Sequence, residues 1–282
     1  MKKTCIIITG LLVLLVFVSL FITLFQEDIP LGSKLALVRI EGPIIDSQEA
    51  VEEIKEYAKD NSIKAIVLRV DSPGGAVAPS QEIYEEVKKA VAKKKVIVSM
   101  GSLAASGGYY ISAPATKIIA NPGTLTGSIG VIMEVPNVEG LMNKIGIKTE
   151  VIKSGKHKDM ASAFRSMGKE ERKILQGVMD NVHEQFIKAV SEGRKIRMEE
   201  LRKIADGRVF TGEQAKTYGL VDELGTLEDA LKTAANLAGL KEEPVVVFKK
   251  DKVSLFDLLR NKFPKEITDI FPTVKIKYLF SP

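Results

Sequence analysis

The sequence predicts an α/β protein with a mostly parallel sheet, preceded by one N-terminal transmembrane helix. Three observations lead to this prediction: apolar runs typical of buried strands alternate with amphipathic helical patterns, no clear break divides them, and the N-terminus is uniformly apolar. A chain of 282 residues that is 45% hydrophobic can bury a full core. We expect an anchor in residues 1–28, one α/β domain in residues 29–240, and a C-terminal strand and tail in residues 241–282.

The N-terminal segment carries a strong signal for a membrane span. Residues 4–26 contain no charged side chain and are long enough to cross roughly 30 Å of hydrocarbon as a helix. Two lysines precede this segment and two acidic residues follow it, so the positive-inside rule keeps the N-terminus cytoplasmic. A cleaved secretory signal is the alternative, but no small-x-small cleavage site follows Phe25. We therefore expect a single-pass protein of the cytoplasmic membrane whose domain lies on the extracytoplasmic side.

Composition argues against several classes of partner and cofactor. The net charge of +5 is mild, and lysines alternate with glutamates in helical runs, so we expect solvated faces and no nucleic-acid partner. The single cysteine, Cys5, lies in the apolar N-terminus, which leaves the exported part without a thiol for a disulfide. The HEQFI segment at His183 lacks the second histidine of a zinc-protease motif. We predict neither a metal nor another cofactor.

The first half of the domain alternates strands and helices. A capping box formed by Asp46 and Glu49 predicts the start of the first helix, and the apolar run KAIVLRV is typical of a strand buried on both faces. The expected strands cover residues 34–42, 64–70 and 95–100, with a helix over about residues 80–93 between the last two. This βαβα order predicts parallel strands joined by right-handed crossovers.

Two further helices are expected in the second half. A long helix over about residues 169–194 repeats apolar side chains in a stripe at positions 174, 178, 182 and 186, which favours packing along its length. A last amphipathic helix begins after Thr226, with Asp229 completing a capping box, and ends at Gly239.

Three turns rich in glycine and serine follow the expected strands. The DSPGG turn, residues 71–75, allows backbone N–H groups to approach a ligand, although an ordinary Pro-Gly turn is the simpler interpretation of this motif alone. The GSLAASGG turn, residues 101–108, sets Ser106 at the start of a helix beside the Gly107 N–H, unless these small residues only serve close packing. The TLTGSIG turn, residues 124–130, is weakly specific by itself.

A lysine in a later polar segment is the candidate partner of the serine. Lys158 lies in SGKHKDM, and a serine nucleophile with a lysine base is typical of a hydrolase. The amine must lose its proton near neutral pH, so burial has to lower its pKa from about 10.4 towards roughly 7 to 8. Asp159 would oppose this shift if it faced the amine, and we predict that it enters a structural ion pair elsewhere. The competing base is His157 in a Ser-His-Asp triad, whereas His183 is expected to be structural.

Five motifs taken in order resemble one family. DSPGG, AASGGYYIS, TGSIGV, SGKHKDM and DGRVFTGEQAKTYGLVDELG together resemble the signal peptide peptidase A family of bacterial membrane peptidases, from about Leu35 to Gly239. The wider fold is similar to the Clp protease proteolytic subunit and the crotonases, which implies a ββα-spiral. By this resemblance Ser106 is the nucleophile, Lys158 the general base and Ser128 the residue that assists the lysine. The N–H groups of Gly75 and Gly107 are expected to form the oxyanion hole.

The same resemblance implies the substrate and the assembly. The family degrades remnant signal peptides, so we expect extended apolar peptides held at a strand edge by β-augmentation. It assembles as a ring in which serine and lysine meet across a subunit boundary, so we expect a homo-oligomer, an octamer, with shared active sites. The alternatives are a peptidase of the same clan that cleaves a membrane-protein partner, such as a stomatin-like protein, and a catalytically silent scaffold. For the C-terminal tail the sequence leaves three expectations open: it forms an interface, covers the assembly, or remains mobile and enters an active site as a product-like peptide.

Overall fold

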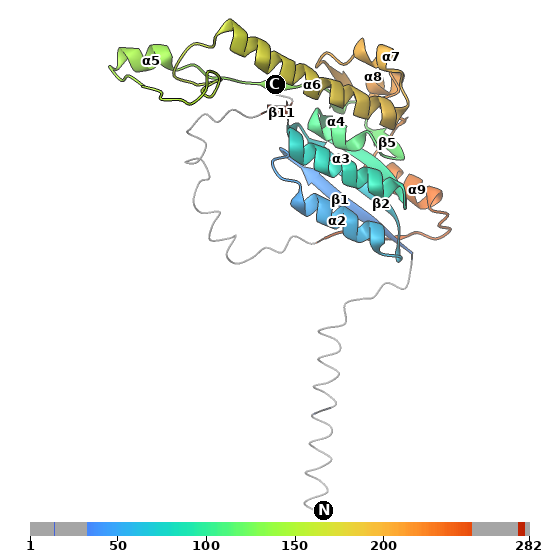
Figure 1. The fold of residues 1–282 in the computed structure, drawn as a ribbon. Helices are drawn as coiled ribbons and strands as arrows, with labels where there is room; N and C mark the ends of the chain where they lie inside the picture. Colours follow the sequence, from blue (N-terminus) through green and yellow to red (C-terminus); the bar gives the residue numbers. More distant parts are fainter. Residues whose placement is uncertain (1–13, 15–32, 250–275, 280–282) are drawn as a thin grey trace, which may run out of the picture. The chain divides into compact units, whose positions relative to one another are not determined.

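The computed structural model describes Leu14, residues 33–249 and residues 276–279 (Figure 1). Within these residues no helix combines the length and the apolar character needed to cross a membrane. The predicted transmembrane segment, residues 4–26, lies outside the described residues except for Leu14. The anchor therefore stays a prediction from the sequence.

A mostly parallel sheet organises the domain, as the sequence predicts. Its main path runs in the order β10-β1-β2-β4-β5-β9, and every neighbouring pair on this path is parallel. β6 adds to β4 in parallel, and β8 pairs with β6 in the antiparallel sense. The strands are β1 (Lys34–Glu41), β2 (Ile63–Ser72), β4 (Lys95–Ala105), β5 (Lys117–Ala120), β6 (Leu125–Gly127), β8 (Val209–Thr211), β9 (Glu223–Leu224) and β10 (Val245–Val247).

The central strand β2 is covered on both faces, which explains its continuous apolar sequence. Ile66 and Leu68 point into a core that also contains apolar side chains of α2 (Gln48–Lys59) and α3 (Val77–Val91). Ala65 and Val67 point to the opposite face, which is covered by α9 (Leu227–Leu237). Helices on both faces are the arrangement that a buried parallel sheet requires. Figure 1 shows α2 and α3 side by side over one face.

Several predicted boundaries shift in the structure. The Asp46–Glu49 capping box is wrong: α2 begins after Ser47, and the Asp46 carboxylate accepts a hydrogen bond from the Gln48 N–H instead, at 2.8 Å. The helix α3 starts at Val77, earlier than predicted, because it follows the short strand β3 (Gly74–Ala76) without a loop. The Thr226–Asp229 capping box of α9 is confirmed.

The long helix α6 (Lys169–Arg194) forms over the predicted residues, but its buried apolar side chains all lie in its C-terminal half. Phe186 and Val190 are fully enclosed, whereas Ile174 and Val178 are 38% and 40% exposed. Within one chain, the rest of the domain therefore covers the predicted apolar stripe only along the C-terminal half of the helix. The shorter helices are α4 (Gly107–Ser112), α5 (Glu139–Lys144), α7 (Met198–Arg202) and α8 (Gly212–Thr217).

Residues 134–167 extend the chain between the short strand β7 (Ile132–Met133) and the start of α6. This segment, called here the lysine lobe because it contains Lys158, has no fully buried residue. Its exposed apolar side chains are Leu141, Ile145, Ile147, Val151, Ile152 and Phe164. Figure 1 shows α5 and the adjoining loops of this lobe near the N-terminal part of α6.

A second, antiparallel sheet contains a strand from the C-terminal tail. Its order is β3-β11-β7, where β11 comprises Ile276–Leu279. In the register of this sheet, Tyr278 stands opposite Gly75 and Lys277 stands opposite both Ala76 and Ile132. The DSPGG motif thus ends in a strand whose edge pairs with an extended segment.

Candidate active site

Ser106 lies in a strained junction between a strand and a helix. β4 ends at Ala105 and α4 begins at Gly107, which leaves Ser106 between them with φ 52° and ψ −117°. Positive φ is uncommon for a residue with a Cβ; it costs on the order of 1–3 kcal/mol and persists only where the surrounding structure enforces it. Ser106 is 1% exposed, and its Oγ makes no hydrogen bond within the described residues. The junction holds an unpaired hydroxyl in a fixed position.

Ser128 is brought beside Ser106 by the pairing of two parallel strands. Ala105 at the end of β4 stands opposite Gly127 at the end of β6, so the two serines follow paired residues. The Ser106 N–H donates to the Gly127 carbonyl at 2.8 Å, and the Ser128 N–H donates to the Arg208 carbonyl at 2.8 Å. Ser128 also has a positive φ, 50°. Two serines that were predicted from separate motifs therefore converge at one end of the sheet.

Ser128 also borders a cavity beside α6. The cavity measures about 400 Å³ and is lined by Ser128, Gly130, Val131, Ile132, Gln176, Met179, Asp180, His183, Asp206 and Gly207. His183 donates a hydrogen bond from Nε2 to the Ile129 carbonyl at 3.2 Å, which is consistent with the structural role predicted for it.

The two predicted oxyanion glycines also lie next to each other. A Cβ added to Gly107 would stand 2.7 Å from the Ser80 Oγ and 3.1 Å from the Gly75 nitrogen, so β3 and the start of α4 approach closely. A Cβ on Gly75 would collide with the Ile44 backbone, 2.5 Å from its carbonyl carbon. Gly75 needs to be glycine because backbone passes directly over it, whereas Gly107 is confined by the Ser80 side chain and the backbone of β3. Four of the five predicted site residues are thus assembled within one chain.

Lys158 is the exception, because the structure does not bring it to this group. Its side chain is exposed on the lysine lobe, and its backbone N–H donates to the Gly155 carbonyl at 3.1 Å. The Ser106 hydroxyl has no hydrogen-bond partner among the described residues, lysine included. A single chain therefore presents the serine and the lysine separately.

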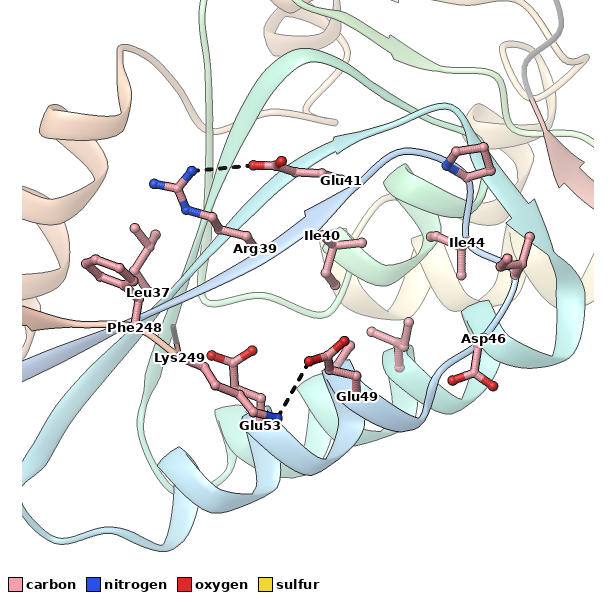
Figure 2. A pocket seen from close by; sticks show the side chains of 14 residues that line it. Leu37, Arg39, Ile40, Glu41, Ile44, Asp46, Glu49, Glu53, Phe248 and Lys249 are labelled. Atoms are coloured by element: carbon pink, nitrogen blue, oxygen red, sulfur yellow. Dashed lines mark ion pairs between the residues drawn. The ribbon is translucent and has the colours of Figure 1, made fainter. Parts of the chain in front are cut away.

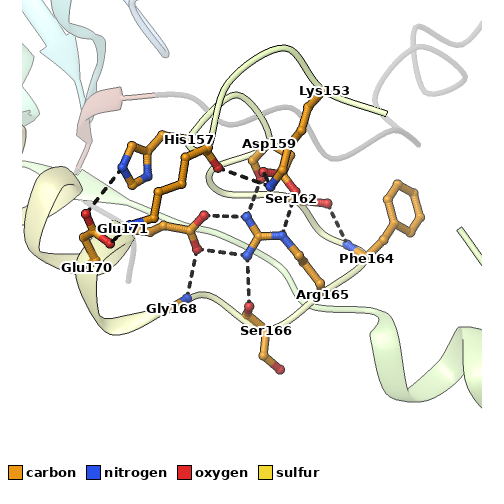
Figure 3. A network of polar contacts seen from close by, with 11 residues as sticks. Lys153, His157, Asp159, Ser162, Phe164, Arg165, Ser166, Gly168, Glu170 and Glu171 are labelled. Carbon is orange, nitrogen blue, oxygen red and sulfur yellow. Dashed lines mark hydrogen bonds and ion pairs between the residues drawn. The ribbon is translucent and has the colours of Figure 1, made fainter. Parts of the chain in front are cut away.

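The carboxylate next to Lys158 is held by an ion-pair network (Figure 3). Asp159 accepts a hydrogen bond from Arg165 Nε at 2.8 Å and pairs with Lys153. The guanidinium of Arg165, followed by Lys153, holds the pKa of Asp159 well below its usual range. The predicted structural ion pair of Asp159 is confirmed. The sequence analysis missed Arg165, whose only signal was its position six residues after Asp159 and six before Glu171.

This network also removes the carboxylate that a triad on His157 would use. His157 Nε2 faces the Glu170 carboxylate at 3.5 Å, and its Nδ1 has no hydrogen-bond partner within the described residues. Asp159 is engaged by Arg165 instead. The chain therefore does not form the Ser106-His157-Asp159 arrangement.

A larger cavity lies on the other side of Ile44, between β1 and α2 (Figure 2). It measures about 730 Å³ and contains none of the predicted site residues. Four of its charged groups form two ion pairs: Arg39 with Glu41 at 3.5 Å, and Lys249 with Glu49 at 3.6 Å. Burial raises the pKa of Glu53 on its floor. Within the described residues, no cluster of histidine, cysteine and acidic side chains is arranged to hold a metal ion.

Comparison with known proteins decides the family. The sequence pattern that defines peptidase family S49 matches residues 88–241, which is more than half of the chain. The chain belongs to peptidase family S49. The Synechocystis sp. protein slr0021, which is named as a protease, is 45% identical over 213 residues, covering 75% of this chain and 77% of the relative. The resemblance to the signal peptide peptidase A family is confirmed, and this S49 chain is a peptidase.

Two further relatives and one solved structure extend the comparison. Protease 4 of Salmonella typhi is 37% identical over 251 residues, covering 86% of this chain and 40% of the relative. An Enterococcus faecium protein named as a signal peptide peptidase, SppA, is 38% identical over 236 residues, covering 78% of this chain and 68% of the relative. A ClpP1 mutant of Listeria monocytogenes matches with 20% identity and a TM-score of 0.47, covering 69% of this S49 chain and 93% of the other.

Proposed function

We propose that this S49 peptidase is a membrane-anchored serine endopeptidase in which Ser106 is the nucleophile and Lys158 of a neighbouring copy is the general base. One observation carries the proposal: Ser106 has a buried, unpaired hydroxyl in a strained turn, while Lys158 is exposed on the lysine lobe. Backbone strain and a buried, unpaired polar group both lower the stability of the folded state. Such features are typical of a reactive centre. The missing partner comes from outside the chain.

The assembled residues support an acyl-transfer reaction. The neutral amine of Lys158 takes the Ser106 proton while Oγ attacks the peptide carbonyl carbon. The N–H groups of Gly75 and Gly107 stabilise the negative oxygen that forms, and Ser128 orients the amine. The ammonium then returns the proton to the leaving amine, and water hydrolyses the acyl-serine by the same route. Enclosure of an amine at a subunit boundary removes water from it, and desolvation disfavours an ammonium form.

Assembly into a homo-oligomer supplies that boundary. The lysine lobe exposes apolar side chains such as Ile145, Ile152 and Phe164, and the N-terminal half of α6 exposes Ile174 and Val178. Apolar groups gathered on adjoining segments of a single chain favour association, because contact removes them from water. We infer a ring of identical subunits, and the family resemblance suggests eight.

The edge of β3 supports an extended peptide as the substrate. β11 of the tail pairs with it antiparallel, with Tyr278 opposite Gly75, so this edge accepts a segment through backbone hydrogen bonds. A peptide bound in the same way lies beside the oxyanion glycines. The apolar anchor at residues 4–26 holds the site near a membrane, where released signal peptides lie. We therefore infer remnant signal peptides as the substrate class, processed on the extracytoplasmic side of the cytoplasmic membrane.

The test compares variants of the full chain in detergent on apolar peptides. Ser106→Ala and Lys158→Ala should each abolish hydrolysis while leaving the size of the oligomer unchanged. Lys156→Ala is the matched control, because this neighbouring lysine forms an exposed ion pair with Glu170. Activity that survives Lys158→Ala but not His157→Ala would support a histidine base. An intact wild-type oligomer that cleaves no peptide would support a silent scaffold.

A further inference from the structure

Arg165 connects the segment that carries Lys158 to the first turn of α6 (Figure 3). On one side its Nε donates to the Asp159 carboxylate at 2.8 Å and its Nη2 donates to the Asp159 carbonyl at 3.2 Å. On the other side its Nη1 and Nη2 donate to the two carboxylate oxygens of Glu171, Nη1 at 2.9 Å. This guanidinium thus bridges two acidic residues that come from separate segments.

The two carboxylates are more enclosed than the guanidinium that joins them. The side chains of Asp159 and Glu171 are 11% and 10% exposed, and that of Arg165 is 32% exposed. Glu171 is fixed further, because it accepts the Gly168 N–H at 2.9 Å and so caps α6. A bidentate pair between arginine and a carboxylate has a defined geometry as well as a favourable energy. The helix end is therefore a rigid support for Arg165.

The position of Lys158 depends on this support. Consecutive turns, from the Lys158 N–H to Gly155 and from the Ser162 N–H to Asp159, place Lys158 directly before the residue that Arg165 holds. Lysine has a long side chain, so the backbone that carries it must be fixed if its amine is to reach a serine reproducibly.

We propose that Arg165 is a positioning residue for the general base: it fixes the Lys158 segment on α6 and binds the Asp159 carboxylate so that this charge does not pair with the Lys158 amine. The inference rests on the proposed function, in which Lys158 is the base. The lysine itself donates and accepts the proton, and Arg165 acts only through Asp159 and Glu171.

The charges around Arg165 determine how its removal should change the electrostatic field at Lys158. Asp159 faces Lys153 from its own segment and Arg165, and Glu171 faces Arg165 from α6. The adjacent charges, Lys156, His157 and Glu170, pair with one another. Without Arg165, the Asp159 carboxylate keeps only Lys153 as a cationic partner among the described residues. Its negative charge then acts more strongly on Lys158.

The experiment measures kcat, KM and the pH profile of kcat/KM for the full chain in detergent. Arg165→Met should lower kcat at least about tenfold, with KM within about twofold, because the base is misplaced and the peptide site is not. The acidic limb of the profile should move to higher pH, because a positive charge beside the base is lost. Adding Asp159→Asn to Arg165→Met should return the limb to its original position, because the unbalanced charge is gone. Lys156→Met is the matched control and should behave like the wild type.

A second variant protects the test against a folding defect. Arg165→Lys keeps the charge and loses the bidentate geometry, so kcat should fall while the acidic limb stays in place. Melting temperature and oligomer size are measured for every variant. A loss of stability in Arg165→Met with no shift of the limb would reduce Arg165 to a structural residue and overturn the proposal.

Lys158→Ala, measured in parallel, separates the two levels of inference. If it stays active, the proposed function is wrong. If it is inactive while Arg165→Met retains the wild-type kcat and pH profile, only the positioning role of Arg165 is wrong.

Discussion

Replacement of Gly75 by alanine tests the geometry of the proposed oxyanion site. The new Cβ would stand 2.5 Å from the Ile44 carbonyl carbon and 2.7 Å from the Ile44 nitrogen, and closer still to the carbonyl oxygen. These atoms belong to the backbone, so no rotation of a side chain relieves the collision. Either β3 or the segment at Ile44 has to move.

The contacts between these segments give the size of the expected loss in stability. Two hydrogen bonds hold these segments together: the Ile44 N–H donates to Gly74 at 2.8 Å and the Ala76 N–H donates to Ile44 at 2.7 Å. Each is worth about 1 kcal/mol, so Gly75→Ala should lower the free energy of unfolding by about 2 kcal/mol. Since domains are stable by roughly 5–15 kcal/mol, the variant should still fold. Displacement of one oxyanion donor should lower kcat about 10²- to 10³-fold.

Urea unfolding and peptide hydrolysis measure the two effects on the same preparation. Gly123→Ala is the matched control, because a Cβ there meets no atom within 4 Å and the residue has no positive φ. It should change the free energy of unfolding by less than about 0.5 kcal/mol and leave kcat unchanged. A Gly75→Ala protein with wild-type stability and kcat would refute the close approach of Ile44 and β3.

Three other predictions concern the core, the tail and the lysine lobe. Phe186→Ala should lower the free energy of unfolding by about 3–5 kcal/mol in urea, because the ring is fully buried, whereas Phe248→Ala, on an exposed ring, should have little effect. Removal of residues 276–282 should lower KM for peptides, because β11 then no longer competes for the edge of β3; an unchanged KM would contradict this competition. Hydrogen bonds from Arg165 lower the pKa of Glu171 to about 2, and that of Asp159 also falls. Because these pKa values are lowered in the folded state, their stabilising contribution is complete above about pH 4.5 and is lost towards pH 2, so hydrogen exchange of the lobe, corrected for intrinsic rate, should rise over that range.

The elements that the sequence predicts well are those defined by local patterns. α6 and the Thr226 cap of α9 form where expected, because helical periodicity and capping chemistry depend on residues a few positions apart. The convergence of Ser106 and Ser128 also follows from the order of the motifs, because each motif follows a strand and neighbouring parallel strands end together.

The features that the sequence did not predict depend on distant partners. β4 continues to Ala105, five residues beyond the expected strand, because β6 pairs with a small-residue segment that has little strand propensity of its own. The Asp46–Glu49 box failed because Ile44 pairs with Gly75 and so fixes how the chain enters α2. The bridge made by Arg165 requires the lysine lobe to fold back onto α6, which no local pattern encodes.

The central claim is that Ser106 and Lys158 of different copies form one active site. Ser106→Ala and Lys158→Ala chains, each inactive alone, are coexpressed with different tags and mixed oligomers are isolated by both tags. At equal composition, random assembly pairs an intact serine with an intact lysine at about one site in four, so roughly a quarter of the wild-type activity per subunit should return. Mixed oligomers that stay inactive, although both chains are present and the wild type is active, would show that no site is shared between copies.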